Sequence, residues 1–330
     1  MQIIMGGSGS TGSSLLKNIL NRHPDIFSGE ETTFFAKKMI YDDWKKAKKR
    51  VLKKRFWGLR NHGWHLFNGT KLLHQEYLWD MEELGDLLEQ SSTLIEFTNS
   101  FYQKPLEKKC ATSWLEKTPA NAACFAAFLN SFESGKVIHI VRNPLDTIAS
   151  LQSRGYDLYY ATGIYLLNTA CGTTVRNSDR STVVKYEDLT MKPEETIRDL
   201  CRFLEVSFLP TMLEPQGEIV QHPQLKGWNY DETAAIGRGS VGRFNSLGEE
   251  QQNAILEAVN LIHINSRGKD YYNTEITTIK EICELLEYKF YEVGSSSTSK
   301  LLHAFRNKDR MSRLLRGYPT GFYYPLTIKS

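Results

Sequence analysis

A glycine-rich turn at residues 6–14 constrains the fold of this chain more than any other segment. It follows a short apolar segment, residues 2–5, and leads directly into an amphipathic segment, residues 13–21. A strand, a glycine-rich turn and a helix in this order allow backbone N–H groups to close around an anion at the positive end of the helix. Two of its glycines have Walker A spacing, but Ser13 stands where that motif has its lysine. The turn therefore predicts an anion site, with a serine-rich turn that binds nothing as the alternative.

Apolar and amphipathic segments alternate along the rest of the chain. Buried strands are predicted at residues 136–141 and 182–185, and short strands or strand ends at residues 94–97 and 114–117. Helices are predicted near Pro144 and at residues 37–55, 121–132, 193–204 and 249–262. This order predicts an α/β fold in which a mostly parallel central sheet, P-loop-like at its first turn, is flanked by helices on both faces.

The length and composition predict a self-sufficient core. With 330 residues, 41% hydrophobic and 24% charged, the chain can bury enough apolar surface without disulfides or metals. We expect one domain over residues 1–294, followed by a serine-rich linker and a basic tail over residues 295–330. Five scattered cysteines without a CxxC pair are typical of a cytoplasmic protein. No apolar run approaches the ~20 residues that a membrane span requires.

The net charge of +3 conceals an uneven distribution of basic residues. Lysine and arginine are dense at residues 37–60 and again at residues 300–330. A basic run of this kind is usually a solvated helix face, and the alternative is an electrostatic funnel for a polyanionic ligand. The small net charge excludes a histone-like protein, and we expect no nucleic-acid partner.

A second signal lies where the predicted strand at residues 136–141 ends. Arg142 follows that strand directly, and Asp146 and Ser150 come four and eight positions later. At ~100° per residue these three side chains share one side of a helix. They could clamp a phosphate beyond the carboxyl end of the strand, where α/β sheets bind ligands. A structural ion pair between Arg142 and Asp146 is the alternative.

Together these segments resemble the sulfotransferases that use 3′-phosphoadenosine 5′-phosphosulfate (PAPS). Residues 10–16 are similar to the loop that binds the 5′-phosphosulfate in that family, and Arg142 with Ser150 is similar to its 3′-phosphate signature. Residues 185–189 (KYEDL) resemble a segment found downstream in the family, and residues 238–244 (RGSVGRF) resemble a late loop that closes on the 3′-phosphate. The four motifs occur in the family's order over about 240 residues.

This resemblance implies PAPS as the cosubstrate, adenosine 3′,5′-bisphosphate as a product, and no metal. It also implies which residues contact the nucleotide. These are Gly9, Ser10, Thr11, Gly12, Ser13, Ser14, Arg142, Ser150, Tyr186, Arg238 and Gly239.

The chain resembles the tyrosylprotein sulfotransferases and their bacterial relatives more closely. The run from His23 to Thr32 and the segment at residues 116–119 (EKTP) are similar to two motifs of that group. The likeness implies that Glu31 is the catalytic base and that Lys117 contacts the sulfuryl group. The alternatives are a carboxylate at a helix N-terminus for Glu31 and a surface or salt-bridged lysine for Lys117.

One residue departs from the family pattern. Ser10 stands where most members have an arginine or lysine close to the departing phosphate. A serine can donate a hydrogen bond there but cannot neutralise charge, so Ser10 is a catalytic position whose missing charge has to come from Lys117 or from the acceptor. A nucleotide-binding protein with impaired catalysis is therefore an alternative function.

Three functions remain open at this stage. The first is sulfuryl transfer to a hydroxyl of a small molecule, a sugar or a peptide, and the second is the impaired nucleotide-binding protein. A P-loop kinase is disfavoured, because Ser13 replaces the Walker lysine and Arg142 stands at the strand end where such a kinase would have an aspartate for magnesium. His62 and His65 have HxxH spacing without a third ligand nearby, so we expect no metal site. The aromatic residues between Trp57 and Trp79 are expected to fill a core or to line an acceptor pocket.

Overall fold

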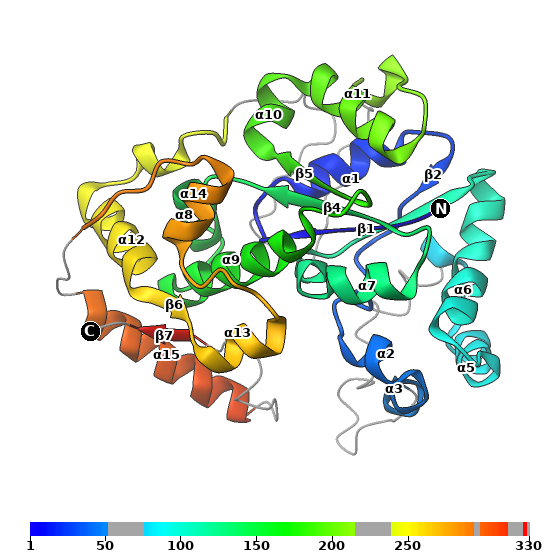
Figure 1. The fold of residues 1–330 in the computed structure, drawn as a ribbon, viewed down its shortest axis with the longest axis horizontal. Coiled ribbons are helices and arrows are strands. Elements are labelled where there is room, and N and C mark those ends of the chain that lie inside the picture. Colours follow the sequence, from blue (N-terminus) through cyan, green and yellow to red (C-terminus); the bar gives the residue numbers. More distant parts are fainter. Residues whose placement is uncertain (52–75, 215–238, 294–297, 316–325, 329–330) are drawn as a thin grey trace.

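The computed structural model describes residues 1–51, 76–214, 239–293, 298–315 and 326–328. Its centre is a sheet of five strands in the order β2-β3-β1-β4-β5 (Figure 1). Every neighbouring pair in this sheet is parallel. The strands are β1 (Gln2–Gly7), β2 (Ile26–Phe27), β3 (Ser113–Lys117), β4 (Lys136–Val141) and β5 (Ser181–Lys185).

Helices cover both faces of this sheet, as the alternating pattern predicted (Figure 1). Along β1, Ile3 and Met5 pack on one face against α1, α10 and α11, whereas Ile4 lies in the core formed with α5, α6 and α7 on the other face. This alternation follows from the two-residue period of a strand. The helices are α1 (Ser13–Asn21), α5 (Met81–Gln90), α6 (Leu94–Lys109), α7 (Phe125–Ser131), α10 (Tyr186–Met191) and α11 (Pro193–Leu204).

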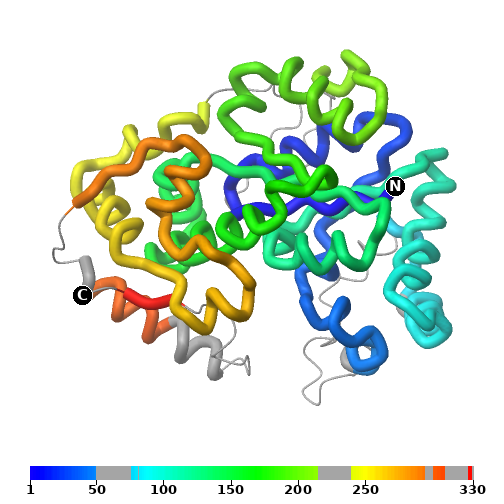
Figure 2. Tube along the Cα trace, in the orientation of Figure 1, coloured from blue at the N-terminus to red at the C-terminus, as the bar shows by residue number. Residues whose placement is uncertain are grey.

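A third core lies beyond the sheet and includes the C-terminal part of the chain. It gathers α8, α9, α12, α14 and α15 around Tyr165 and Leu302, and the antiparallel pair β6 and β7 borders it. Figure 2 shows this C-terminal part, coloured yellow to red, at the opposite end of the molecule from the cyan helices. Its elements are α8 (Pro144–Gln152), α9 (Leu158–Gly172), α12 (Glu249–Leu261), β6 (Ile262–Ile264), α13 (Ser266–Tyr272), α14 (Ile279–Leu286), α15 (Thr298–Leu315) and β7 (Leu326–Ile328).

The prediction of a strand at residues 94–97 is wrong. These residues form the first turn of α6, where the Thr93 side chain accepts a hydrogen bond from the Glu96 N–H. The buried positions continue through Phe97, Phe101 and Pro105, a spacing of three to four residues that identifies one face of a helix. A four-residue window was too short to separate this period from that of a strand.

Two predicted helices are interrupted. The segment at residues 121–132 is a 3-10 helix, Pro119–Cys124, followed by α7. The basic segment at residues 37–55 forms α2 (Met39–Asp42) and α3 (Trp44–Val51), and residues 52–55 lie outside the described residues. Asp43 separates α2 from α3, because its backbone is not helical (φ −155°, ψ 87°) and its carboxylate accepts the Lys46 N–H.

The predicted linker and tail are partly described. Helix α15 begins at Thr298, inside the predicted linker, and Leu302 is fully buried among residues of α9 and α12. Strand β7 pairs with β6, so the described tail residues pack on the preceding part of the chain. The domain boundary at residue 294 stays a prediction. Within the described ranges, no helix combines the length and the apolar character needed to cross a membrane.

Candidate active site

The glycine-rich loop makes a sharp reversal between β1 and α1. Ser10 and Gly12 have φ values of 65° and 85°, in the left-handed region. A Cβ atom at Gly12 would lie 2.3 Å from the Tyr186 ring, so only glycine allows Tyr186 to pack this closely on the loop. The Thr11 hydroxyl closes the turn by donating to the Ser8 carbonyl over 2.8 Å. The loop therefore has one defined shape, set by its own residues and by the residue that follows β5.

The start of α1 meets the requirements of an anion site. Its N-cap is Gly12, which supplies no side-chain cap, and its first turn holds no acidic residue. The first N–H groups of a helix have no partner within the helix. The hydroxyls of Ser8 and Ser10 are also buried without a hydrogen-bond partner. The loop thus holds buried donors of the kind that bind an anion, and the assigned contacts at residues 9–14 stay a prediction.

Lys117 and Glu31 meet beside this loop. Lys117 ends β3, its side chain is 4% exposed, and its ammonium group forms an ion pair with Glu31 Oε1. The same Nζ lies 3.2 Å from the Ser14 hydroxyl at the start of α1. Lys117 is therefore both salt-bridged and adjacent to the loop. The ion pair does not conflict with the predicted contact between Lys117 and the sulfuryl group. Glu31 lies outside any helix, which removes the helix-terminus explanation for its carboxylate.

A second lysine, which the sequence analysis overlooked, lies next to this pair. Lys17 on α1 comes one turn after Ser14, and its Nζ pairs with Glu30 Oε1 over 3.2 Å. Consecutive glutamates, Glu30 and Glu31, therefore each pair with a lysine from a different element. The helical spacing of Ser14 and Lys17 was the available signal, since residues three apart share a helix face.

Arg142 joins the glycine-rich loop to the late loop at residues 239–244. Its guanidinium donates to the carbonyls of Ser10, over 2.9 Å, and of Ser240. The group lies 4.8 Å above the Tyr186 ring, and its Nε is buried without a hydrogen-bond partner. The Tyr165 hydroxyl donates a hydrogen bond to the backbone carbonyl of Arg142 over 3.0 Å. Burial lowers the pKa of Arg142, and the charge of Asp146 opposes that decrease.

Asp146 holds the late loop instead of forming an ion pair with Arg142. Its two carboxylate oxygens accept the Gly242 N–H over 2.7 Å and the Phe244 N–H over 2.9 Å. The residue between them, Arg243, reaches the hydroxyl of Ser150 over 3.0 Å. Arg243 was quoted within the late motif but was not assigned a role. Its positive charge, at the next-to-last position of that motif, was the signal.

The structure therefore brings most of the assigned residues to the carboxyl edge of the sheet. The glycine-rich loop, Arg142 and Tyr186 follow β1, β4 and β5 respectively, Lys117 is the last residue of β3, and Ser150 lies on α8. Gly239 begins the described part of the late loop, and no atom of another described residue lies within 4 Å of a Cβ built on it, apart from its chain neighbours. Arg238 lies outside the described residues, as do His62 and His65. No cluster of three metal-ligating side chains occurs within the described ranges.

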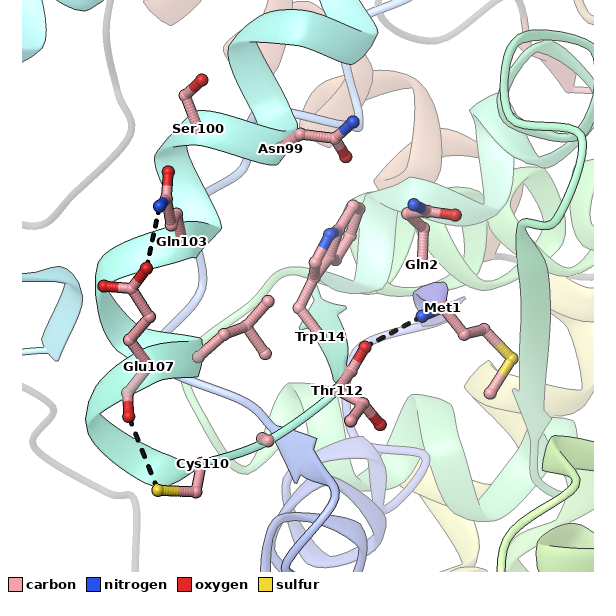
Figure 3. Close-up of a pocket in the computed structure, with 11 residues that line it drawn as sticks. Met1, Gln2, Asn99, Ser100, Gln103, Glu107, Cys110, Thr112 and Trp114 are labelled. Carbon is pink, nitrogen blue, oxygen red and sulfur yellow. Dashed lines mark hydrogen bonds between the residues drawn. The ribbon is translucent and has the colours of Figure 1, made fainter.

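A separate groove of about 450 Å³ lies at the opposite, amino edge of the sheet (Figure 3). Trp114 and residues of α6 line it, and the Met1 amino group donates to the Thr112 carbonyl at its wall. None of the assigned nucleotide and catalytic residues that the structure describes lines this groove. The aromatic residues Tyr77 and Trp79 pack in the core with α6, and the Tyr77 hydroxyl donates to the Glu30 carbonyl over 2.5 Å, next to Glu31.

Comparison with known proteins agrees with this geometry. A model described as the sulfotransferase family matches residues 2–210. Protein-tyrosine sulfotransferase of Drosophila melanogaster is 23% identical over 239 residues, which are 67% of this chain and 41% of that protein. The chain thus spans less than half the length of that relative.

Among solved structures, the sulfotransferase domain from the Synechococcus PCC 7002 olefin synthase has the same fold. The TM-score is 0.52 at 21% identity, and the match covers 77% of this chain and 92% of that domain. The family model spans well over half of the 330 residues and includes the glycine-rich loop, Lys117 and Arg142. The chain belongs to the sulfotransferase family.

Proposed function

We propose that this protein transfers a sulfuryl group from PAPS to a hydroxyl of an acceptor and releases adenosine 3′,5′-bisphosphate. One observation carries the proposal: the Lys117–Glu31 pair and the Arg142–Ser150 group lie at the same glycine-rich loop, joined to it by hydrogen bonds to Ser14 and Ser10. A donor with a 5′-phosphosulfate and a 3′-phosphate has anionic groups for both sides of the loop. The unpartnered Ser10 hydroxyl and Arg142 Nε support this fit.

Each side chain has a defined task in this proposal. Glu31 accepts the proton of the acceptor hydroxyl as a new oxygen–sulfur bond forms, a role worth roughly 10²–10⁴ in rate. The sulfur–oxygen bond to the phosphate breaks, and its electron pair stays on the phosphate oxygen. Lys117, with the N–H groups of the loop, stabilises the charge that develops there. Sulfuryl transfer resembles phosphoryl transfer, in which positioning and charge stabilisation supply most of the catalysis.

On the other side of the loop, Arg142, Arg243 and Ser150 are proposed to bind the 3′-phosphate. Within the described ranges neither arginine forms an ion pair with a carboxylate, so their charges are available to an anion. Bidentate recognition suits the planar guanidinium group. The Tyr186 ring stacks on the Arg142 guanidinium and packs on Gly12.

The acceptor is proposed to be a hydroxylated small molecule, sugar or peptide. The relative named as a protein-tyrosine sulfotransferase favours a tyrosine in a peptide. Tyr156 is 45% exposed and stacks on Tyr160, with the ring centroids 5.1 Å apart. Burial raises the pKa of Tyr156 most, and the charges of Tyr160 and of Glu31 raise it further, so Tyr156 lies close to Glu31. An acceptor ring beside the proposed base would therefore meet an aromatic pair. The free state of all five cysteines supports a cytoplasmic location, which also stays a proposal.

Calorimetry and an acceptor panel test the function. We expect adenosine 3′,5′-bisphosphate to bind at least about tenfold more tightly than ATP with Mg²⁺, a difference of ~1.4 kcal/mol. Labelled PAPS should then sulfate at least one of a tyrosine peptide, a simple phenol or a sugar. Tighter binding of ATP would refute the proposal. Binding of the bisphosphate without any sulfated acceptor would favour the nucleotide-binding protein that the neutral Ser10 suggests.

A further inference from the structure

Glu116 is a buried carboxylate for which the proposed reaction has no use. Only 1% of its surface is exposed, and within the described ranges no lysine or arginine forms an ion pair with it. Burial raises its pKa, and hydrogen bonds from Asn121, Thr118 and Thr32 oppose that increase. A carboxylate buried without a cation is costly, so its surroundings have to compensate through hydrogen bonds.

All of those donors come from two short segments. Oε1 of Glu116 accepts the Thr32 N–H over 2.9 Å, the Thr32 hydroxyl over 2.8 Å and the Thr118 hydroxyl over 2.7 Å. Oε2 accepts the side-chain amide of Asn121 over 2.5 Å. Thr118 in turn accepts the Thr33 N–H over 3.1 Å. One carboxylate thus ties residues 32–33 to residues 118–121 beyond β3.

These two segments carry the proposed catalytic pair. Thr32 directly follows Glu31, and Lys117 directly follows Glu116 in β3. Because neighbouring side chains of a strand point to opposite faces, Glu116 can bind the turn while Lys117 faces Ser14 of α1. The turn itself is strained, since Thr33 has a φ of 55°, which is rare for a β-branched residue. Such a conformation persists only where its surroundings enforce it.

We propose that Glu116 is a positioning residue for sulfuryl transfer: it holds the Glu31 turn against the end of β3, so that Glu31 meets Lys117 at the glycine-rich loop. The inference rests on the proposed function, because that function assigns Glu31 and Lys117 their roles. Glu116 itself touches neither the donor nor the acceptor.

Two variants and a matched control test this role. Glu116→Gln keeps the size of the side chain and weakens its acceptor capacity, and Thr118→Val removes the hydroxyl that links Glu116 to Thr33. Thr98→Val is the control, since Thr98 is an equally buried threonine whose hydroxyl bonds only to carbonyls within α6. The measurements are amide hydrogen exchange at residues 31–34 and 8–14, bisphosphate affinity, and kcat with the acceptor that the panel identifies.

Both Glu116→Gln and Thr118→Val should speed exchange at residues 31–34 at least about tenfold, a change that local opening would produce. Turnover should fall by about the same factor in Glu116→Gln, while bisphosphate affinity and exchange at residues 8–14 stay within about threefold. Thr98→Val should leave exchange at residues 31–34 unchanged. If Glu116→Gln fails to fold, Thr118→Val decides the question by itself.

Two results would overturn the inference. One is a loss of turnover with unchanged exchange at residues 31–34, and the other is an equal rise in exchange across both segments with loss of bisphosphate binding. The proposed function fails separately, if the unmodified protein does not bind the bisphosphate. In that case the exchange measurements still decide whether Glu116 holds the turn.

Discussion

The two sides of the glycine-rich loop are held in different ways. On the side proposed to bind the sulfuryl group, Lys117 and Glu31 pair directly, and Glu116 accepts hydrogen bonds from the turn that follows Glu31. On the side proposed to bind the 3′-phosphate, Arg142 contacts the late loop and Arg243 belongs to it, and two hydrogen bonds to Asp146 attach this loop to α8. The first side is a compact cluster with its own counter-charge, whereas the second gathers arginines that repel each other. Turnover and nucleotide affinity should therefore respond to different residues.

The largest effect is expected from Glu31→Gln. This change keeps the shape of the side chain but removes the proton acceptor, so turnover should fall roughly 10²–10⁴-fold. Bisphosphate affinity, measured by calorimetry, should stay within about threefold, or ~0.7 kcal/mol. Glu30→Gln is the matched control and should retain most of the turnover. Full activity in Glu31→Gln would show that the sulfuryl side does not contain the base.

Lys117→Met should lower turnover by about 10²–10³, the range found when one stabilising donor is removed from an active site. The long apolar side chain of methionine keeps the packing at position 117, where the lysine side chain is 4% exposed. Lys17→Met provides the control, because the Lys17–Glu30 pair is partly exposed and such pairs contribute only ~0–1 kcal/mol. A larger loss of turnover in Lys17→Met than in Lys117→Met would show that Lys17, and not Lys117, stabilises the transferring group.

On the 3′-phosphate side, Arg243→Ala should weaken bisphosphate binding by about 1.5–3 kcal/mol, the value of hydrogen bonds to a charged group. Affinity for adenosine 5′-monophosphate, which lacks the 3′-phosphate, should hardly change, and turnover at saturating PAPS should be maintained. Arg142→Ala should act in the same direction. Arg202→Ala on the exposed surface of α11 is a control for net charge. If discrimination between the two nucleotides survives in Arg243→Ala, the late loop does not recognise the 3′-phosphate.

The smallest effect is expected from Ser10→Arg. The arginine would restore the family's positive charge near the departing phosphate and should raise turnover about threefold, because it strengthens an interaction formed mainly in the transition state. It should also recover part of the loss in Lys117→Met. Its bulk has to fit a half-buried position with a φ of 65°, and reduced bisphosphate affinity would report a poor fit. With affinity intact, the absence of any gain would show that Ser10 is not close to the leaving oxygen.

Sequence patterns predicted the parts of the site that are local. The glycine-rich loop with α1, and Arg142 with α8, each consist of a strand, a turn and a helix that adjoin in the chain. The roles of Asp146 and Glu116 could not be predicted, because their donors lie far away in sequence, at Gly242, Phe244 and Thr32. The prediction of a strand at residues 94–97 was wrong for a related reason. The helical spacing of the buried residues becomes visible only when residues further along the helix are included.

The central place of β1 in the sheet has a consequence for how the protein is made. Strand β1 leaves the ribosome before its partners β3 and β4, and the Ser10 carbonyl accepts its hydrogen bond from an arginine 132 residues later. The glycine-rich loop is thus synthesised well before Arg142 but can reach its final shape only after Arg142 has emerged. Contacts of such long separation slow folding and leave apolar strands exposed in the meantime. Truncated nascent chains that end before β4 should therefore depend on chaperones more than chains that include it.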